Sequence, residues 1–218
     1  MRMRKKKNLL PRMEACSSLL VADPRALRGR WRELLPDARE LRVELGCGKG
    51  RFTAETAAAE PDVLLIAVEK VPDAMVVAME RAQAAGLHNV FFVDGDAACL
   101  PEFFAPGEVD RIYINFCDPW PRSNQKKRRL THGNFLQLYR RVLPLGGEIH
   151  FKSDNDKLFE WSLEEIPRFR EELTPEFISQ YGLTDLMKAV ESVPPLHTPY
   201  VPLNSIVREF VGGSCFQY

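Results

Sequence analysis

The sequence predicts an α/β fold built on a doubly wound, mostly parallel sheet with an antiparallel closing strand. Short apolar runs alternate along the chain with segments of helical periodicity. A glycine-rich turn directly follows the first apolar run, and acidic residues follow the later runs. Strands that are buried on both faces and separated by helices are typical of parallel sheets.

The first half of the chain contributes three of the expected strands. Residues 41–45 form the first strand, which ends in the glycine turn, and a helical pattern follows over residues 52–59. Residues 63–68 are continuously apolar, which predicts a buried second strand. Apolar residues at helical spacing predict a helix over 72–85, with a proline near its first turn, before a third strand at 90–93.

The second half continues the alternation to a fifth strand. Residues 109–116 alternate and then run apolar, which predicts the fourth strand, and a helical segment at 135–143 separates it from a fifth strand at 147–151. Residues 158–169 have the pattern of an amphipathic helix. The expected antiparallel closing strand covers residues 205–211.

Length and composition predict a single domain over residues 1–218. With 45% hydrophobic and 28% charged residues, the chain suits a soluble fold with a full core. A basic arm covers about residues 1–12, and prolines mark a variable loop at about residues 192–205. No linker or internal repeat indicates a second domain.

The sequence offers no membrane segment and no metal-binding pattern. No apolar run approaches the roughly 20 residues that span a bilayer, and the basic start lacks the apolar segment of a secretory signal. We therefore expect a cytoplasmic protein without a membrane partner. The five cysteines form no C-x-x-C pair and the four histidines are scattered, so we expect reduced thiols and no bound metal.

Acidic residues gather at one predicted edge of the sheet. Ligands of doubly wound sheets lie beyond the carboxyl ends of the strands, near the point where the strand order reverses. A single acid at such a place is more often a helix cap or a solvated loop residue. Five acids at or just past predicted strand ends instead indicate a site: Glu44, Glu69, Asp96, Asp118 and Asp154.

The glycine turn excludes the two common nucleotide-phosphate loops. A dinucleotide loop needs a glycine at Arg51, and a phosphate-binding P-loop needs Ser or Thr after Lys49. Residues 44–50 read E-L-G-C-G-K-G and resemble the E/D-x-G-x-G-x-G loop of Rossmann-like class I methyltransferases. The resemblance implies S-adenosyl-L-methionine as cofactor. Its ribose diol suits Glu69 as an acceptor, and its adenine amino group suits Asp96.

Further segments resemble one family, the bacterial tRNA (guanine-N7-)-methyltransferases. Residues 118–121 read D-P-W-P, residues 127–130 read K-R-R-L, and residues 152–160 read K-S-D-N-D-K-L-F-E. The similarity extends from about residue 41 to residue 163. It implies transfer of a methyl group to N7 of a guanine in the tRNA variable loop, by a monomer or homodimer.

The resemblance assigns roles by position. It implies that the cofactor is bound by Glu44, Gly46, Gly48, Glu69, Asp96 and Asp118, with Asp118 also the catalytic residue. It implies that the substrate is contacted by Arg122, where the family usually has lysine, and by Asp154, Thr198 and Tyr200. It implies that RNA is bound by Asn124, Gln125, Lys126, Lys127, Arg128 and Arg129.

Two segments depart from the family pattern, and they leave alternatives open. Residues 122–129 read R-S-N-Q-K-K-R-R instead of K-K-R-H-x-K-R-R, and Val201 stands where the family has a glutamate. A catalytically weak tRNA-binding module is one alternative. A methyltransferase of an exocyclic base amine is another, although its D/N-P-P-Y/F loop would need a proline at Trp120. Trp120 itself suits a base-stacking role or a place in the core.

Overall fold

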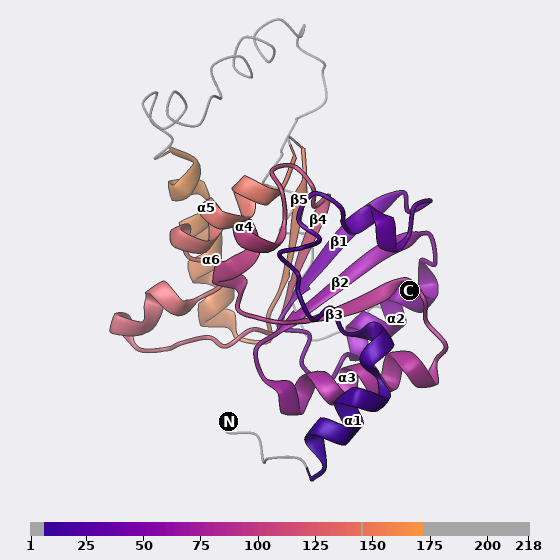
Figure 1. Ribbon diagram of the computed structural model, residues 1–218. Coiled ribbons are helices and arrows are strands. Elements are labelled where there is room, and N and C mark those ends of the chain that lie inside the picture. Colours follow the sequence, from indigo (N-terminus) through magenta and orange to yellow (C-terminus); the bar gives the residue numbers. More distant parts are fainter. Residues whose placement is uncertain (1–6, 145, 172–218) are drawn as a thin grey trace, which may run out of the picture.

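The chain forms a five-stranded parallel sheet with helices on both faces (Figure 1). The computed structural model describes residues 7–144 and 146–171. The strand order is β3-β2-β1-β4-β5, and every pairing among the described strands is parallel. The strands are β1 (Glu40–Leu45), β2 (Val63–Glu69), β3 (Val90–Asp94), β4 (Arg111–Asn115) and β5 (Glu148–Lys152). The predicted doubly wound parallel sheet is confirmed, whereas the antiparallel strand expected at residues 205–211 lies outside the described residues.

Helices cover the two faces of the sheet in two groups. One face packs against α1 (Leu9–Ala15), α2 (Arg51–Ala59) and α3 (Pro72–Ala84). The other packs against α4 (Leu100–Phe103), α5 (Gly133–Val142) and α6 (Asp156–Glu171). Short 3-10 turns complete the described elements: η1 (Ser17–Leu19), η2 (Trp31–Leu34), η3 (Ala97–Cys99) and η4 (Ser123–Arg128).

Strand β2 shows why continuous apolar runs become the buried strands of this sheet. All of its residues are buried. Leu65 and Ala67 belong to the core under α1 to α3, and Leu64, Ile66 and Val68 belong to the core on the opposite face. Successive side chains of a strand point to opposite faces, so a strand with helices on both sides needs apolar residues at every position.

The reversal of strand order creates the crevice expected for a ligand. The chain runs from β1 outward through β2 to β3, and then returns to place β4 on the other side of β1. Because all described strands are parallel, their carboxyl ends lie at one edge of the sheet, and the reversal falls between β1 and β4. The segments that follow these two strands begin at Gly46 and Phe116.

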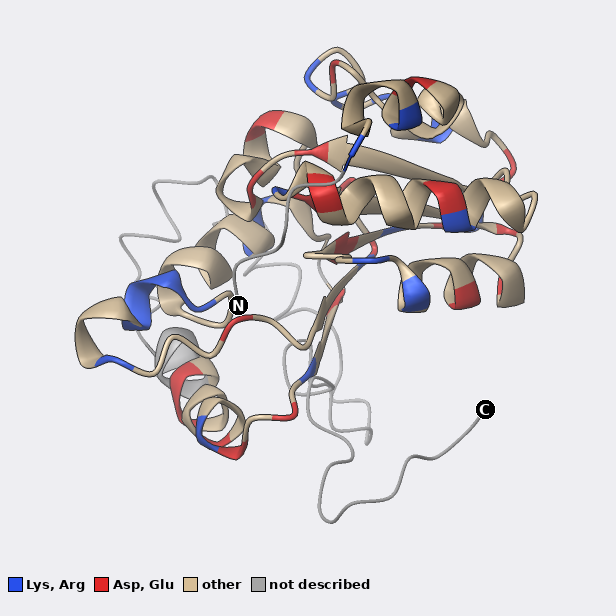
Figure 2. Cartoon of the chain, turned by 90° about the horizontal axis from the view of Figure 1, so that it is seen from below, with Lys and Arg blue, Asp and Glu red and all other residues tan. Residues whose placement is uncertain are grey.

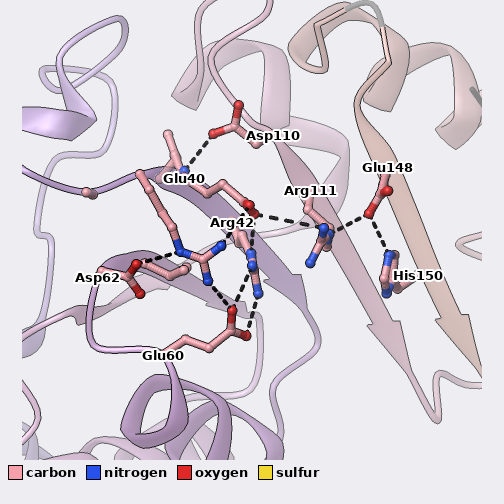
Figure 3. Close-up of polar contacts among 12 residues, drawn as sticks. Glu40, Arg42, Glu60, Asp62, Asp110, Arg111, Glu148 and His150 are labelled. Carbon is pink, nitrogen blue, oxygen red and sulfur yellow. Dashed lines mark hydrogen bonds and ion pairs between the residues drawn. The ribbon is translucent and has the colours of Figure 1, made fainter.

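A polar network ties the sheet together toward the other ends of the strands (Figure 3). Arg42 is 2% exposed, and its guanidinium bonds Glu40 at 2.6 Å and Glu60 at 2.7 Å. Arg111 continues the network with ion pairs to Glu148 at 2.7 Å and to Glu40 at 4.0 Å. The network therefore joins β1, β4 and β5 to the segment after α2. Within the described residues, no helix has the length and apolar character to cross a membrane.

Candidate active site

The turn after β1 contains three glycines in the left-handed backbone conformation, which form an open cradle. Gly46, Gly48 and Gly50 have φ of 76°, 56° and 68°. A Cβ on Gly46 or Gly48 would meet no atom within 4 Å, so both backbones face free space. A Cβ on Gly50 would lie 2.5 Å from Cβ of Ala78, so this glycine instead lets α2 approach α3. Two glycines therefore expose backbone to a ligand, and the third serves packing.

Glu44 is a buried carboxyl at the point where the strand order reverses. It is 2% exposed. The hydroxyl of Thr53 donates to its Oε2 at 2.5 Å, and Nδ2 of Asn115 on β4 lies 3.5 Å from its Oε1. Burial raises the pKa of Glu44 to about 7, with a smaller contribution from the nearby charge of Glu69 and against the hydrogen bonds from Thr53 and Asn115, which lower it. A cationic ligand would favour the ionised form of this carboxyl.

Glu69 is fixed by backbone amides at the carboxyl end of β2. Its Oε2 accepts from the amide of Gly48 at 2.8 Å, and its Oε1 accepts from the amide of Val71 at 2.9 Å. The first of these hydrogen bonds attaches the glycine turn directly to the second strand. A carboxylate has about four lone-pair sites, so Glu69 keeps acceptors for a ligand hydroxyl.

Asp96 lies beyond β3 and caps η3. Its Oδ1 accepts from the amide of Ala98 at 3.0 Å, and its Oδ2 lies 3.7 Å from Nζ of Lys70. The residue is exposed. Asp96 is thus both a cap and an available acceptor next to the end of β2.

Asp118 lies on a strained loop after β4. Phe116 and Trp120 on either side of it are non-glycine residues with φ of 52° and 42°. Asp118 is exposed, and within the described part of the chain its carboxylate accepts no hydrogen bond. Asp154, which follows β5, and Arg122 are also exposed. The two acids and the arginine are therefore available to a substrate along the carboxyl edge of β4 and β5.

The basic segment folds as the 3-10 turn η4 and mostly faces solvent. Asn124, Lys126, Lys127 and Arg128 are exposed, and Gln125 is partly exposed. Figure 2 shows Lys and Arg gathered on this protruding segment, at the left of the view. Cζ of Arg128 lies 5.0 Å from the ring centroid of Trp120, which is itself only partly buried.

Arg129 differs from the other residues of the basic segment because it is buried, at 6% exposure. It donates to carbonyl oxygens of its own loop, at Pro119 and Trp120. The substrate residues expected at Thr198 and Tyr200 lie outside the described residues, as does the loop at about residues 192–205.

Two contacts at this edge involve residues that no sequence pattern indicated: Thr53 on Glu44, and Lys70 beside Asp96. A third residue, Asn115, contacts Glu44 from β4, and its position three residues before the D-P-W-P loop is the one local signal that points to it. Within the described residues, no group of three or more His, Cys, Asp or Glu side chains could hold a metal ion. The edge instead offers an open glycine cradle lined by carboxylates, which suits a cationic ligand with hydroxyl groups.

A family model and two sequence relatives of this chain all describe methyltransferases. Residues 38–182 match the family model described as "Putative methyltransferase". The chain is 42% identical over 187 residues to the tRNA (guanine-N(7)-)-methyltransferase of Geobacillus kaustophilus (strain HTA426), covering 85% of this chain and 86% of the relative. It is 43% identical over 167 residues to the enzyme of the same name from Clostridioides difficile (strain 630), covering 76% and 78%. Among solved structures, the antibiotic-resistance methyltransferase Kmr matches with 24% identity and a TM-score of 0.49, over 69% of this chain and 84% of that one.

Proposed function

We infer that this chain, which belongs to the tRNA (guanine-N(7)-)-methyltransferase family, transfers a methyl group from S-adenosyl-L-methionine to N7 of a guanine in tRNA. The observation that carries this function is identity above 40% over most of both chains to two enzymes of that name. We further propose that the target guanine lies in the variable loop of tRNA. The D-P-W-P loop and the following basic segment support this assignment.

The carboxyl edge suits the cofactor. S-adenosyl-L-methionine supplies a methyl group on a positively charged sulfonium, and it carries a free ribose diol and an adenine amino group. We propose that Gly46 and Gly48 leave room for it, because a side chain at either would occupy their open space. Glu44 and Glu69 would accept hydrogen bonds from its cationic and hydroxyl groups, and Asp96 would accept from the adenine amino group.

The acceptor chemistry needs no general base. Guanine N7 carries an exposed lone pair, so no proton leaves before the methyl group is accepted. The chain's task is to hold N7 in line with the methyl group and to stabilise the positive charge that develops on the guanine ring. We propose that Asp118 and Asp154 accept hydrogen bonds from the N1-H and amino edge of the guanine, which become better donors as that charge develops.

The basic segment would bind the tRNA backbone. The exposed cations of η4 offer sequence-independent phosphate contacts next to the Asp118 loop. Arg122 at the start of this segment would contact the substrate. We propose that the enzyme acts in the cytoplasm as a monomer or homodimer. Analytical ultracentrifugation would distinguish these two oligomeric states.

The test is the identity of the methylated nucleoside. Purified protein is incubated with methyl-labelled S-adenosyl-L-methionine and unmodified tRNA, and the RNA is digested and separated. N7-methylguanosine is the expected product. N6-methyladenosine would instead establish the exocyclic-amine alternative, and binding of both cofactor and tRNA without turnover would establish the weak binding module.

Asp118→Asn tests the catalytic assignment within the same assay. Removing one preorganised acceptor from the reacting base should lower kcat about 100-fold or more. Asp156→Asn, an exposed acid at the start of α6 that has no assigned role, is the matched control. Turnover of Asp118→Asn equal to that of the control would refute the role of Asp118.

A further inference from the structure

The loop that carries Asp118 has a strained backbone on both sides of that residue. Phe116 and Trp120 adopt φ of 52° and 42° without being glycines. In this left-handed region the Cβ of an ordinary residue comes close to the following carbonyl oxygen, and such a conformation persists only where its surroundings hold it. The position of Asp118 therefore depends on what supports the loop.

Arg129 supports the loop with two hydrogen bonds. Its Nε donates to the carbonyl oxygen of Pro119 at 3.0 Å, and its Nη2 donates to that of Trp120 at 3.2 Å. The planar fork of a guanidinium suits two neighbouring acceptors, whereas the compact ammonium of lysine does not. Within the described residues, no carboxylate lies at ion-pair distance from Arg129, so the carbonyl oxygens are its main acceptors.

Trp161 closes the other side of the guanidinium. Cζ of Arg129 lies 4.4 Å from the ring centroid of Trp161, which belongs to α6. The ring of Trp161 also stacks on His132 with centroids 6.1 Å apart. Nearby, Glu165 of α6 accepts from the amide of Gly133 at 3.1 Å. Arg129 is thus held between the Asp118 loop and the contact of α5 with α6.

We propose that Arg129, clamped between the loop carbonyls and the Trp161 ring, is a positioning residue that holds Asp118 in place for methyl transfer. The proposal rests on the function inferred above. A buried guanidinium that donates into its own loop is poorly placed for RNA phosphates, whereas Lys127 beside it is exposed. Loss of Arg129 should therefore lower turnover, and loss of Lys127 should weaken tRNA binding.

Steady-state kinetics separate the two roles. Arg129→Gln should lower kcat at least tenfold and change KM for tRNA less than threefold, because a small displacement of a positioned group costs rate rather than binding. Arg129→Lys should restore only part of kcat, since one ammonium cannot replace the planar fork. Lys127→Gln is the charge-matched comparison, and its effect should fall mainly on KM for tRNA.

A second variant removes the other half of the clamp. Trp161→Leu keeps both loop hydrogen-bond acceptors and removes the ring face, so it should lower kcat in the same direction as Arg129→Gln. Circular dichroism checks that each variant is folded. Wild-type kcat in Arg129→Gln, or a rise in KM alone like that of Lys127→Gln, would overturn the proposal.

Hydrogen-deuterium exchange tests the clamp without any turnover. The amide of Phe116 donates to the carbonyl oxygen of Lys152 at 2.8 Å, and exchange of the segment 116–120 reports on this loop. Exchange should be at least tenfold faster in Arg129→Gln than in wild type or Lys127→Gln. A wild type that makes no N7-methylguanosine contradicts the proposed function alone. Unchanged exchange in Arg129→Gln contradicts the clamp.

Discussion

Glu44 combines burial with a place in the proposed cofactor site. Burial raises its pKa from an ordinary value of 4.5 to about 7. Between these two pH values the folded protein binds more protons than the unfolded chain, so the contribution of Glu44 to stability falls as pH rises from 4.5 through 7. A raised carboxyl pKa therefore costs the free protein stability near neutral pH, and a bound cation would offset that cost.

Cofactor binding should accordingly depend on pH through Glu44. Wild-type affinity for S-adenosyl-L-methionine should rise from pH 6 to pH 8 relative to that of Glu44→Gln, because only the ionised carboxyl attracts the cation. Isothermal titration calorimetry measures the affinity of both proteins at each pH. Protonation of the ligand itself affects both proteins equally, so it cancels when the two affinities are compared. As a control, the free energy of unfolding of wild type should fall over pH 5–8 by up to about 3 kcal/mol more than that of Glu44→Gln. Parallel pH profiles for the two proteins would contradict the role of Glu44.

Two glycines of the same turn should respond differently to alanine. Gly50→Ala adds a Cβ 2.5 Å from that of Ala78 as well as left-handed strain, so it should lower the free energy of unfolding by about 3 kcal/mol. Gly48→Ala has similar strain but free space around its Cβ, so it should cost about 1 kcal/mol. It should nevertheless weaken cofactor binding at least tenfold. Denaturant unfolding and calorimetry check both, and equal stability losses would contradict the division of roles in this turn.

At the scale of elements, η4 presents cations next to the loop that carries Asp118. Its exposed members are Lys126, Lys127 and Arg128, whereas Arg129 directly after it is buried. A run of four cations thus divides into three that face solvent and one that faces the protein. The division follows from the short 3-10 turn, which ends at Arg128 and leaves Arg129 at the start of the return toward α5.

Neutralising the three exposed cations should weaken tRNA binding through electrostatics. In the triple variant with glutamine at Lys126, Lys127 and Arg128, log affinity should fall less steeply with log salt concentration, and the magnitude of that slope should decrease by about 2 to 3. A charge-matched control replaces the exposed residues Arg25, Arg28 and Arg30, which lie in another part of the chain. Filter binding at several salt concentrations measures both slopes. The same decrease in the control variant would mean that net charge, and not this segment, determines binding.

At the scale of the whole molecule, the network around Arg42 joins strands on both sides of the reversal point (Figure 3). Hydrogen bonds from Arg42 lower the pKa of Glu40 and of Glu60, and the pKa of Glu148 is also lowered, against the effect of its burial, by His150 and Arg111. A lowered carboxyl pKa gives stability that is present above about pH 4.5 and is lost as pH falls through the folded-state value. The network should therefore make the fold acid-labile.

Arg42→Met should lower the free energy of unfolding by about 2 kcal/mol at pH 7, because it leaves two carboxylates without their buried partner. The difference from wild type should shrink as pH falls from 4.5 toward 3, because protonation of those carboxylates removes the charges that Arg42 stabilises. Arg39→Gln is the matched control, since Arg39 also pairs with Glu40 and Glu60 but is more exposed, and it should cost less than about 1 kcal/mol. Urea unfolding at pH 7 and pH 3 measures both. A pH-independent difference for Arg42→Met would assign its effect to packing.

Local patterns in the sequence determined the helices and strands and the edge of the sheet at which the proposed site lies. The apolar run at residues 63–68 became β2, and the glycine turn at Gly46 and Gly48 became a left-handed cradle at the end of β1. Both outcomes depend on neighbours along the chain, on the period of buried side chains and on the backbone freedom of glycine. The acids at the strand ends could be assigned to one edge because parallel strands end at the same edge.

Tertiary structure alone decided the strand order and the partners of the charged residues. Asn115 reaches Glu44 across 71 positions of the chain, and Trp161 meets Arg129 from a different helix. Within the sequence, Arg129 is indistinguishable from the exposed cations before it. Its burial depends on acceptors and a ring that only folding brings to it, and side chains that contact across long sequence separations leave no periodic signal along the chain.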